Sequence, residues 1–349
     1  MSKLLERRPY GPRDDLQFMR EINDLTHHHL EGCPAYRRVW PEYRAAATLA
    51  EVPFLQAGVF KYFEFKTIAQ GIRHERTLKS SATTTGIASR ISLDEKSTKL
   101  QSRSTAAILT EFLGAEQRPL LVLDNSRSLL APAEISARVA AAVSLRPLAS
   151  DIAFLLDEAD NPQSMNWPRL LSFLERHDEL MIYGFTSMMW LAWGAQAKPE
   201  GISRLLHGKR LRLIHSGGWK KVEAAGVTRE QFERALLQGL GAGSTVLDFY
   251  GLVEQAGLIY PLCQAGFRHT PGWAAVLVRD PITMEPSPDG DVGVLQLFNT
   301  LALGAPYHSV VTEDLGRILR GACACGRRGT RFELLGRVPR SEARGCANV

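Results

Sequence analysis

Residues 248–255 combine three residue types that suit a nucleotide site. They follow a strand-like run at 245–247 and contain Tyr250, Gly251 and Glu254. A tyrosine ring can stack on a base, and a glycine lets backbone approach a ligand. A carboxylate can bind a magnesium ion that bridges phosphates. An aromatic–glycine pair that closes a strand is also an ordinary turn, so the segment gains weight only from others that complete it.

Residues 80–86 read Ser-Ser-Ala-Thr-Thr-Thr-Gly and offer a place for phosphates. Hydroxyls and backbone amides packed this densely can cradle phosphate oxygens. The Gly-Lys-Ser/Thr ending of a Walker loop is absent from the sequence. The alternative is a solvated Ser/Thr turn. The candidate phosphate ligands are Ser81, Thr83, Thr84, Thr85 and Gly86.

Two further segments lie where buried strands are predicted to end. Gly217 and Gly218 follow the strand-like run 211–214, and α/β sheets bind ligands at the carboxyl ends of their strands. The alternative is a tight turn followed by two solvated lysines. Asp314 belongs to an acidic pair at a strand end, where a carboxylate can accept both ribose hydroxyls, and Arg337 could meet phosphate or ribose. A capped β-turn and an exposed arginine are the alternatives.

Three cysteines and one histidine supply a donor set for a metal. Cys263, His269, Cys323 and Cys325 offer three thiols and an imidazole, enough for a closed tetrahedral zinc site. The C-x-C spacing is tighter than the usual knuckle, and buried free cysteines are the alternative.

Helices alternate with short buried strands along the first 270 residues, which predicts α/β architecture with partly parallel sheets. Asp94 is a predicted N-cap and Gly114 a predicted end for one helix. After about residue 270 we expect a smaller β-rich subdomain. The predicted domains are 1–270, 271–337 and a tail at 338–349. Predicted strands lie at 119–124, 180–185, 211–214, 274–279, 292–298 and 309–312, and a predicted helix at 134–143.

Composition narrows the class of protein. The chain has 349 residues, 45% hydrophobic and 23% charged, with a net charge of only +5, which suits an ordinary globular protein. It has no arginine-rich arm or zinc-finger spacing, so we expect no nucleic-acid partner. It has no apolar run of bilayer length and no secretion signal, so we expect a cytoplasmic protein. Five scattered cysteines argue against a disulfide framework.

The order of these segments resembles that of the adenylate-forming superfamily, and more closely its acyl-protein synthetase (LuxE-type) branch, which is related to phenylacetate-CoA ligases. The similarity covers roughly residues 55–346. It is carried by Phe60-Lys61, Ser92-Leu-Asp94, Gln101, His215-x-Gly-Gly-Trp-Lys-Lys221, Tyr250-Gly-x-x-Glu254-Gln255, Arg279-Asp-Pro281, Thr312-Glu-Asp314 and Arg344-Gly-Cys346. Phenylacetate-CoA-ligase-like relatives look similar at the four Cys/His positions.

The resemblance implies that a carboxylate attacks the α-phosphate of Mg-ATP and gives an acyl adenylate and pyrophosphate. It also implies the large α/β domain of that superfamily with a small β-rich subdomain. By position, residues 81–86 would hold phosphates, Tyr250 would flank adenine, Glu254 would bind Mg²⁺ and Asp314 the ribose. Arg337 would contact ribose or phosphate, and Gly217 and Gly218 would line the adenine or acyl pocket. Gly251 would let backbone approach the ligand.

The sequence departs from the family pattern at two places. Ala82 and Thr83 stand where the pattern has Ser-Gly, and a β-branched residue tolerates positive φ badly. Only twelve residues follow Arg337, so we expect the mobile C-terminal domain, with its adenylation lysine, to be absent. Lys220 or Lys221 could substitute for that lysine.

Cys346 is the candidate acyl acceptor, because a thiolate near arginine has a lowered pKa. A thioester would suit a reductase partner. The chain also resembles a similarly short adenylating protein of D-alanylgriseoluteic acid biosynthesis, and that resemblance implies an aromatic substrate such as a phenazine carboxylate. The resemblance to the LuxE-type branch implies a fatty acid instead. The rival hypothesis is a degenerate member that binds nucleotide or acyl ligand, without turnover, as a subunit of a reductase or synthase complex.

Overall fold

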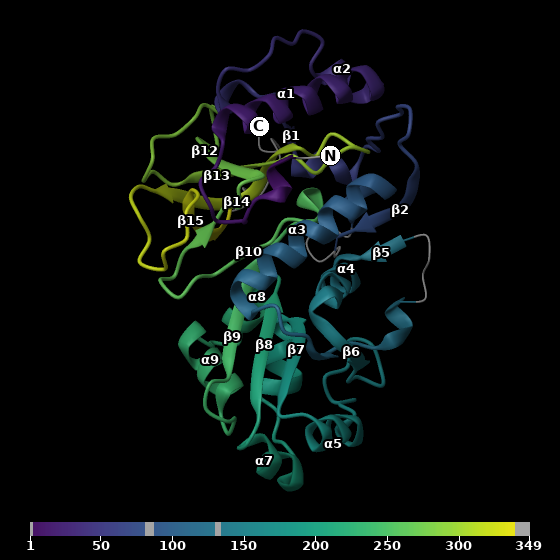
Figure 1. Cartoon of the computed structure of the whole chain (residues 1–349), viewed down its shortest axis with the longest axis vertical. Helices are drawn as coiled ribbons and strands as arrows, with labels where there is room; N and C mark the ends of the chain where they lie inside the picture. The colour runs from purple at the N-terminus through teal and green to yellow at the C-terminus, as the bar shows by residue number, and fades with distance from the viewer. Residues whose placement is uncertain (1–2, 81–86, 130–133, 339–349) are drawn as a thin grey trace, which may run out of the picture.

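The computed structural model describes residues 3–80, 87–129 and 134–338. Its first sheet has the strand order β10-β9-β8-β7-β4-β6 and fills the lower half of Figure 1. Neighbouring strands are parallel except β10, which runs antiparallel to β9. The strands are β4 (Arg118–Val122), β6 (Ala149–Phe154), β7 (Glu179–Phe185), β8 (Arg210–Ser216), β9 (Thr245–Tyr250) and β10 (Tyr260–Pro261).

Helices cover both faces of this sheet, and the side chains of β7 show why. Leu180 and Ile182 enter a core shared with α5, α7 and α9, whereas Met181 and Tyr183 enter the core lined by α3 and α4. A strand buried on both faces needs a continuous apolar run, as its sequence has. The helices are α3 (Glu95–Leu113), α4 (Ala137–Ser144), α5 (Trp167–Arg176), α7 (Glu200–Leu206) and α9 (Arg229–Leu237).

The second sheet contains the late strands of the chain, in green to yellow beside α1 and α2 in Figure 1. Its order is β11-β15-β14-β13-β12, and the short β1 pairs in parallel with β14. The elements are β1 (Leu55–Gln56), β11 (Arg268–His269), β12 (Ala274–Arg279), β13 (Gly293–Asn299), β14 (Ser309–Leu319), β15 (Arg331–Arg337), α1 (Asp15–Gly32) and α2 (Pro34–Val39).

A small third sheet and several short helical turns complete the described chain. The sheet has the order β3-β2-β5, with β2 (His74–Lys79), β3 (Arg90–Asp94) and β5 (Glu134–Ser136). The short turns are η1 (Lys3–Glu6), η2 (Leu49–Glu51), η3 (Ala57–Lys61), η4 (Ser126–Leu129), η5 (Arg146–Leu148), α6 (Thr186–Met188), the π-helical η6 (Met189–Gly194), α8 (Lys220–Glu223) and η7 (Val253–Gln255).

The predicted α/β architecture with partly parallel sheets is confirmed. Asp94 caps α3 by accepting a hydrogen bond from the Ser97 amide, and Gly114 ends that helix, as predicted. The helix predicted at 134–143 is wrong at its start, because residues 134–136 form β5 and pair with β2. The helix begins after Ser136, whose hydroxyl accepts a hydrogen bond from the Val139 amide. Within the described residues, no helix has both the length and the apolarity that a bilayer span requires.

Candidate nucleotide site and metal centre

Tyr250, Asp314 and Arg337 form one hydrogen-bonded group between the two large sheets. Tyr250 ends β9, and Asp314 of β14 is the register partner of Arg337 at the end of β15. The Tyr250 hydroxyl donates to Asp314 Oδ2 at 2.7 Å, and Arg337 Nε donates to Asp314 Oδ1 at 3.2 Å. The structure thus brings together three side chains that are far apart in the sequence, while their roles toward a nucleotide stay predictions.

Burial dominates the electrostatics of this group. It raises the pKa of Asp314, whereas the Tyr250 hydrogen bond and the Arg337 guanidinium act in the opposite direction. Burial and then the charge of Asp314 raise the pKa of Tyr250 well above its ordinary value, so its hydroxyl stays a donor. A carboxylate has about four acceptor positions, so Asp314 keeps capacity for the hydroxyls of a sugar.

Glu254 lies in η7, one short turn after Tyr250, and its side chain is buried. Gln255 fixes this turn by donating from Nε2 to the Tyr307 carbonyl at 2.9 Å. Burial raises the pKa of Glu254, and a hydrogen bond from Ser89 and the charge of Lys61 oppose that rise. Carboxylate oxygens are ligands that Mg²⁺ prefers, so the residue type of Glu254 suits the predicted role.

Ser80 and Ser89, which flank the hydroxyl-rich segment, are hydrogen-bonded to each other, and Ser89 contacts Glu254. The Ser80 amide donates to the Ser89 carbonyl at 3.1 Å, and the Ser89 amide donates to Ser80 Oγ at 2.8 Å. Since Ser89 also contacts Glu254, the base of the loop is tied to the carboxylate. The predicted phosphate ligands lie outside the described residues; they are Ser81, Thr83, Thr84, Thr85 and Gly86. Cys346 also lies outside the described residues.

The predicted glycines follow β8 and β9, which are neighbouring parallel strands. Ser216 is the register partner of Phe249, so Gly217 and Gly218 leave the sheet beside Tyr250. Gly217 has φ of +97°, where a side chain would be strained, and among the described residues no atom lies within 4 Å of the position of a Cβ on Gly218. A Cβ on Gly251 would lie 3.4 Å from the Leu258 carbonyl oxygen.

Lys220 begins α8 just after these glycines, and its predicted role stays a prediction. Lys61 is a residue to which the sequence analysis gave no role. It ends η3, and its Nζ lies 3.3 Å from Glu313 Oε1. The available signal was a lysine directly after the buried Phe60, within a motif that supports the family resemblance. The Lys61–Glu313 contact spans 252 positions in sequence, so spacing could not reveal it.

The four predicted metal ligands do come together. Their ligand atoms all lie within 4.8 Å of one another, with the Sγ atoms of Cys263 and Cys323 3.8 Å apart and Cys325 Sγ 3.3 Å from His269 Nε2. A tetrahedral zinc with bonds of about 2.3 Å to sulfur and 2.0 Å to nitrogen sets separations of about 3.8 Å and 3.5 Å. The geometry therefore fits zinc.

The electrostatics of His269 also suit a metal ligand. Burial, with the nearby Arg327 and Arg331, lowers the pKa of His269 to about 4, so the imidazole is neutral and has a lone pair to offer. Cys263 lies between β10 and β11, and Cys323 and Cys325 between β14 and β15. A metal here would join the hairpin that carries Tyr250 to the one that carries Asp314 and Arg337.

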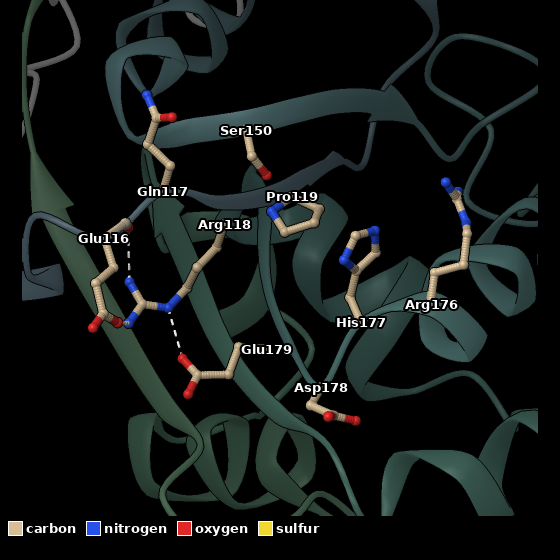
Figure 2. Close-up of a pocket in the computed structure, with 9 residues that line it drawn as sticks. All are labelled: Glu116, Gln117, Arg118, Pro119, Ser150, Arg176, His177, Asp178 and Glu179. Carbon is tan, nitrogen blue, oxygen red and sulfur yellow. Dashed lines mark hydrogen bonds and ion pairs between the residues drawn. The ribbon is translucent and has the colours of Figure 1, made fainter.

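A separate open groove of about 490 Å³ lies at the amino ends of β4, β6 and β7 (Figure 2). Arg118 crosses it, and its guanidinium binds Glu179 at 2.7 Å and Glu116 at 2.6 Å. Its positive charge is thus already balanced by two carboxylates. Since α/β sheets bind ligands at the carboxyl ends of strands, we do not assign the nucleotide to this groove.

The family model of LuxE acyl-protein synthetases matches residues 10–349. Long-chain-fatty-acid–luciferin-component ligases of Aliivibrio fischeri and Vibrio harveyi are 25% and 28% identical over 142 residues, 40% of this chain. The match spans only 37% and 36% of the length of those two relatives. A crystal structure of an open conformation of 2-hydroxyisobutyryl-CoA ligase with 2-HIB-AMP and CoA aligns with a TM-score of 0.68 and 16% identity over 95% of this chain and 77% of that one. The chain therefore has the fold of adenylate-forming enzymes.

Proposed function

The chain belongs to the LuxE acyl-protein synthetase family, and from this membership we propose that it activates a carboxylic acid as an acyl adenylate. A carboxylate oxygen attacks the α-phosphorus of ATP and forms the P–O bond. The bond from that phosphorus to the oxygen bridging the β-phosphate breaks, and pyrophosphate leaves with the electron pair. An anion here attacks an anion, so oriented positive charge is the main requirement on the site.

The observation that supports the proposal is that Tyr250 and Arg337 both donate hydrogen bonds to Asp314, near the buried Glu254. Tyr250 would flank adenine and Asp314 would bind ribose, with Arg337 on ribose or phosphate. Ser80 and Ser89 hold the ends of the loop that would bind phosphates. Bound Mg²⁺, held by Glu254, would neutralise charge on the phosphates.

We propose a thiol as the acceptor of the acyl group. The thiolate attacks the acyl carbonyl, a thioester forms, and AMP leaves. The Val338 amide donates to the Glu313 carbonyl at 3.0 Å, so the described chain ends beside the acidic pair. Cys346 follows eight residues later, and eight residues span at most about 29 Å. We propose Cys346 as the acceptor on this chain length alone, with CoA or a carrier protein as alternative acceptors and a reductase as a partner for the thioester.

Carboxylate-dependent exchange of pyrophosphate into ATP tests the activation step. A panel of long-chain fatty acids and aromatic acids, including a phenazine carboxylate, would identify the substrate class. Exchange with at least one acid supports the proposal. Thermal stabilisation by ATP without exchange for any acid would instead identify a degenerate, nucleotide-binding subunit. A Cys346→Ala variant that still forms acyl-protein would exclude the tail thiol.

We also propose that Cys263, His269, Cys323 and Cys325 hold a structural zinc ion. Support comes from the gathering of all four ligand atoms within 4.8 Å of one another and from two separations, Cys263–Cys323 and Cys325–His269, that lie close to tetrahedral values. Four protein ligands leave no open position on the metal, so this zinc would stabilise the fold rather than take part in the reaction.

A further inference from the structure

We infer that Lys61 binds the α-phosphate of the nucleotide while the acyl adenylate forms. The inference rests on the proposed function and names an additional side chain of the same site.

The backbone holds Lys61 in a fixed place. Leu55 and Gln56 of β1 pair in parallel with Val310 and Val311 of β14. This pairing carries η3 alongside the acidic residues in the middle of β14, where a Cβ added to Gly58 would lie 3.7 Å from Glu313 Oε1.

The end of η3 is anchored by the residue just before the lysine. Phe60 is fully buried, and its ring centroid lies 5.3 Å from that of Phe65. Lys61 therefore projects from a packed turn rather than from a mobile loop.

The surroundings of Lys61 are acidic. Its side chain is only 15% exposed, which is unusual for lysine, and a partly buried ammonium requires a counter-charge. Glu313 lies in contact with Lys61. The positive charge of Lys61 also opposes the rise in the pKa of Glu254, which accepts the hydrogen bond from Ser89. The ammonium thus stands near the carboxylate proposed for Mg²⁺ and near the base of the proposed phosphate loop.

The contact with Glu313 leaves Lys61 available for a ligand. The distance of 3.3 Å is long for a charge-assisted hydrogen bond, and the Glu313 side chain is 42% exposed. A phosphate oxygen would supply the counter-charge that the ammonium needs, and the half-exposed Glu313 carboxylate can turn to water, so a phosphate can take the place of Glu313.

The chemistry gives the ammonium a specific task. As the α-phosphorus becomes five-coordinate, negative charge grows on its non-bridging oxygens. A fixed N–H donor aimed at those oxygens binds more strongly in the transition state than in the ground state, and so raises kcat. In this role the lysine acts as a hydrogen-bond donor and transfers no proton, so the step needs no base at this position.

The rival role for Lys61 is purely structural, as the ion partner of Glu313. We would compare Lys61→Met and Lys61→Gln with a matched control, Lys66→Met. Lys66 is five residues further along and also pairs with a glutamate, Glu64, at 2.7 Å. Two quantities are measured for each purified full chain: the pyrophosphate exchange rate at saturating substrates, and the ratio of the dissociation constants for adenosine and AMP.

We expect both Lys61 variants to lower kcat by about 10²–10³-fold. We also expect them to reduce the preference for AMP over adenosine by about tenfold, because one charged hydrogen bond to phosphate is lost. Lys66→Met should change neither quantity by more than about twofold. Lys61→Gln keeps a polar chain of similar length, so it serves if Lys61→Met does not fold.

The outcomes separate this inference from the proposed function. If the wild-type chain catalyses no exchange with any acid, the proposed function is refuted. The ratio of the dissociation constants for adenosine and AMP then still tests whether Lys61 binds the phosphate. Lys61 variants that keep the wild-type ratio and rate overturn the inference, even if their melting temperatures fall. A loss of rate and ratio in Lys66→Met as well would overturn it too.

Discussion

The Tyr250 hydroxyl lies 2.7 Å from Asp314 Oδ2, although the two residues belong to different sheets. Sixty-four positions separate them in sequence. The bond joins the carboxyl end of the parallel sheet to β14, between the side chains that we propose to flank adenine and ribose. It also orients the carboxylate before any ligand arrives, which reduces the cost of ordering the site on binding.

Tyr250→Phe keeps the ring and removes only the donor to Asp314. The buried carboxylate then loses a partner, so we expect about 1–3 kcal/mol less stability in urea unfolding. We also expect a several-fold rise in the KM for ATP with little change in kcat. Tyr36→Phe is the control, because that hydroxyl makes only a 3.4 Å contact with the Pro53 carbonyl. An unchanged KM in Tyr250→Phe would contradict the orienting role.

Glu254→Gln separates stability from activity and gives a pH dependence. Burial raises the pKa of Glu254 above 4.5, so the folded chain holds this proton at pH values where the unfolded chain has lost it. The stability from this group is complete below pH 4.5 and is lost as pH rises through the folded pKa. Glutamine does not titrate, so the melting temperature of the variant minus that of the wild type should increase as pH rises from 4.5 to 8.

Glu254→Gln should lower the rate of pyrophosphate exchange by at least about 10²-fold, even at pH values where it raises the melting temperature, because the proposed Mg²⁺ ligand is lost. Glu230→Gln is a suitable control, since that side chain is 82% exposed and pairs only with Arg234 on the same helix. A melting temperature difference that stays constant with pH would contradict the raised pKa of Glu254.

Local signals in the sequence were enough for the elements that carry the site. Asp94 and Gly114 mark the ends of α3, and the apolar runs at 180–185 and 211–214 are strands buried on both faces. The aromatic–glycine segment could be recognised because a strand end is a local feature. The acidic pair was predicted at a strand end, which is wrong, because β14 continues through Asp314 to Leu319 and pairs with β15 there.

Long-range contacts could not be predicted in the same way. Residues 134–136 precede an alanine-rich helix and suit its first turn, yet pairing with β2 overrides that preference. The division at residues 270 and 337 into domains stays a prediction. Lys61 meets Glu313 because β1 pairs with β14, the middle strand of a sheet built mostly from later residues.

The proposed zinc site makes a prediction about composition and stability. Purified chain should contain one zinc ion by elemental analysis, and Cys323→Ser should remove it. Loss of the ion frees two loops from each other, so we expect the melting temperature to fall by about 5–10 °C in the variant and in chelated wild type. Cys33→Ser is the matched control, because Cys33 is a buried free cysteine outside the cluster. A Cys323→Ser variant that retains its zinc would refute the assignment.

Gly257 tests how closely the turn after Glu254 must approach α3. It has φ of +81°, and a Cβ there would lie 2.3 Å from Gln101 Cβ and 2.5 Å from Gln101 Cα. The backbone of a helix cannot move aside, so Gly257→Ala should combine strain at positive φ with overpacking and cost about 3 kcal/mol or more. Gly226→Ala has a similar φ of +73° but no atom within 4 Å, and should cost only about 1–2 kcal/mol. Urea unfolding measures both costs, and thermal shift with ATP shows whether displacing the turn weakens nucleotide binding. Equal costs for the two variants would mean that the contact with α3 is not a constraint, and that Glu254 is positioned by its own turn alone.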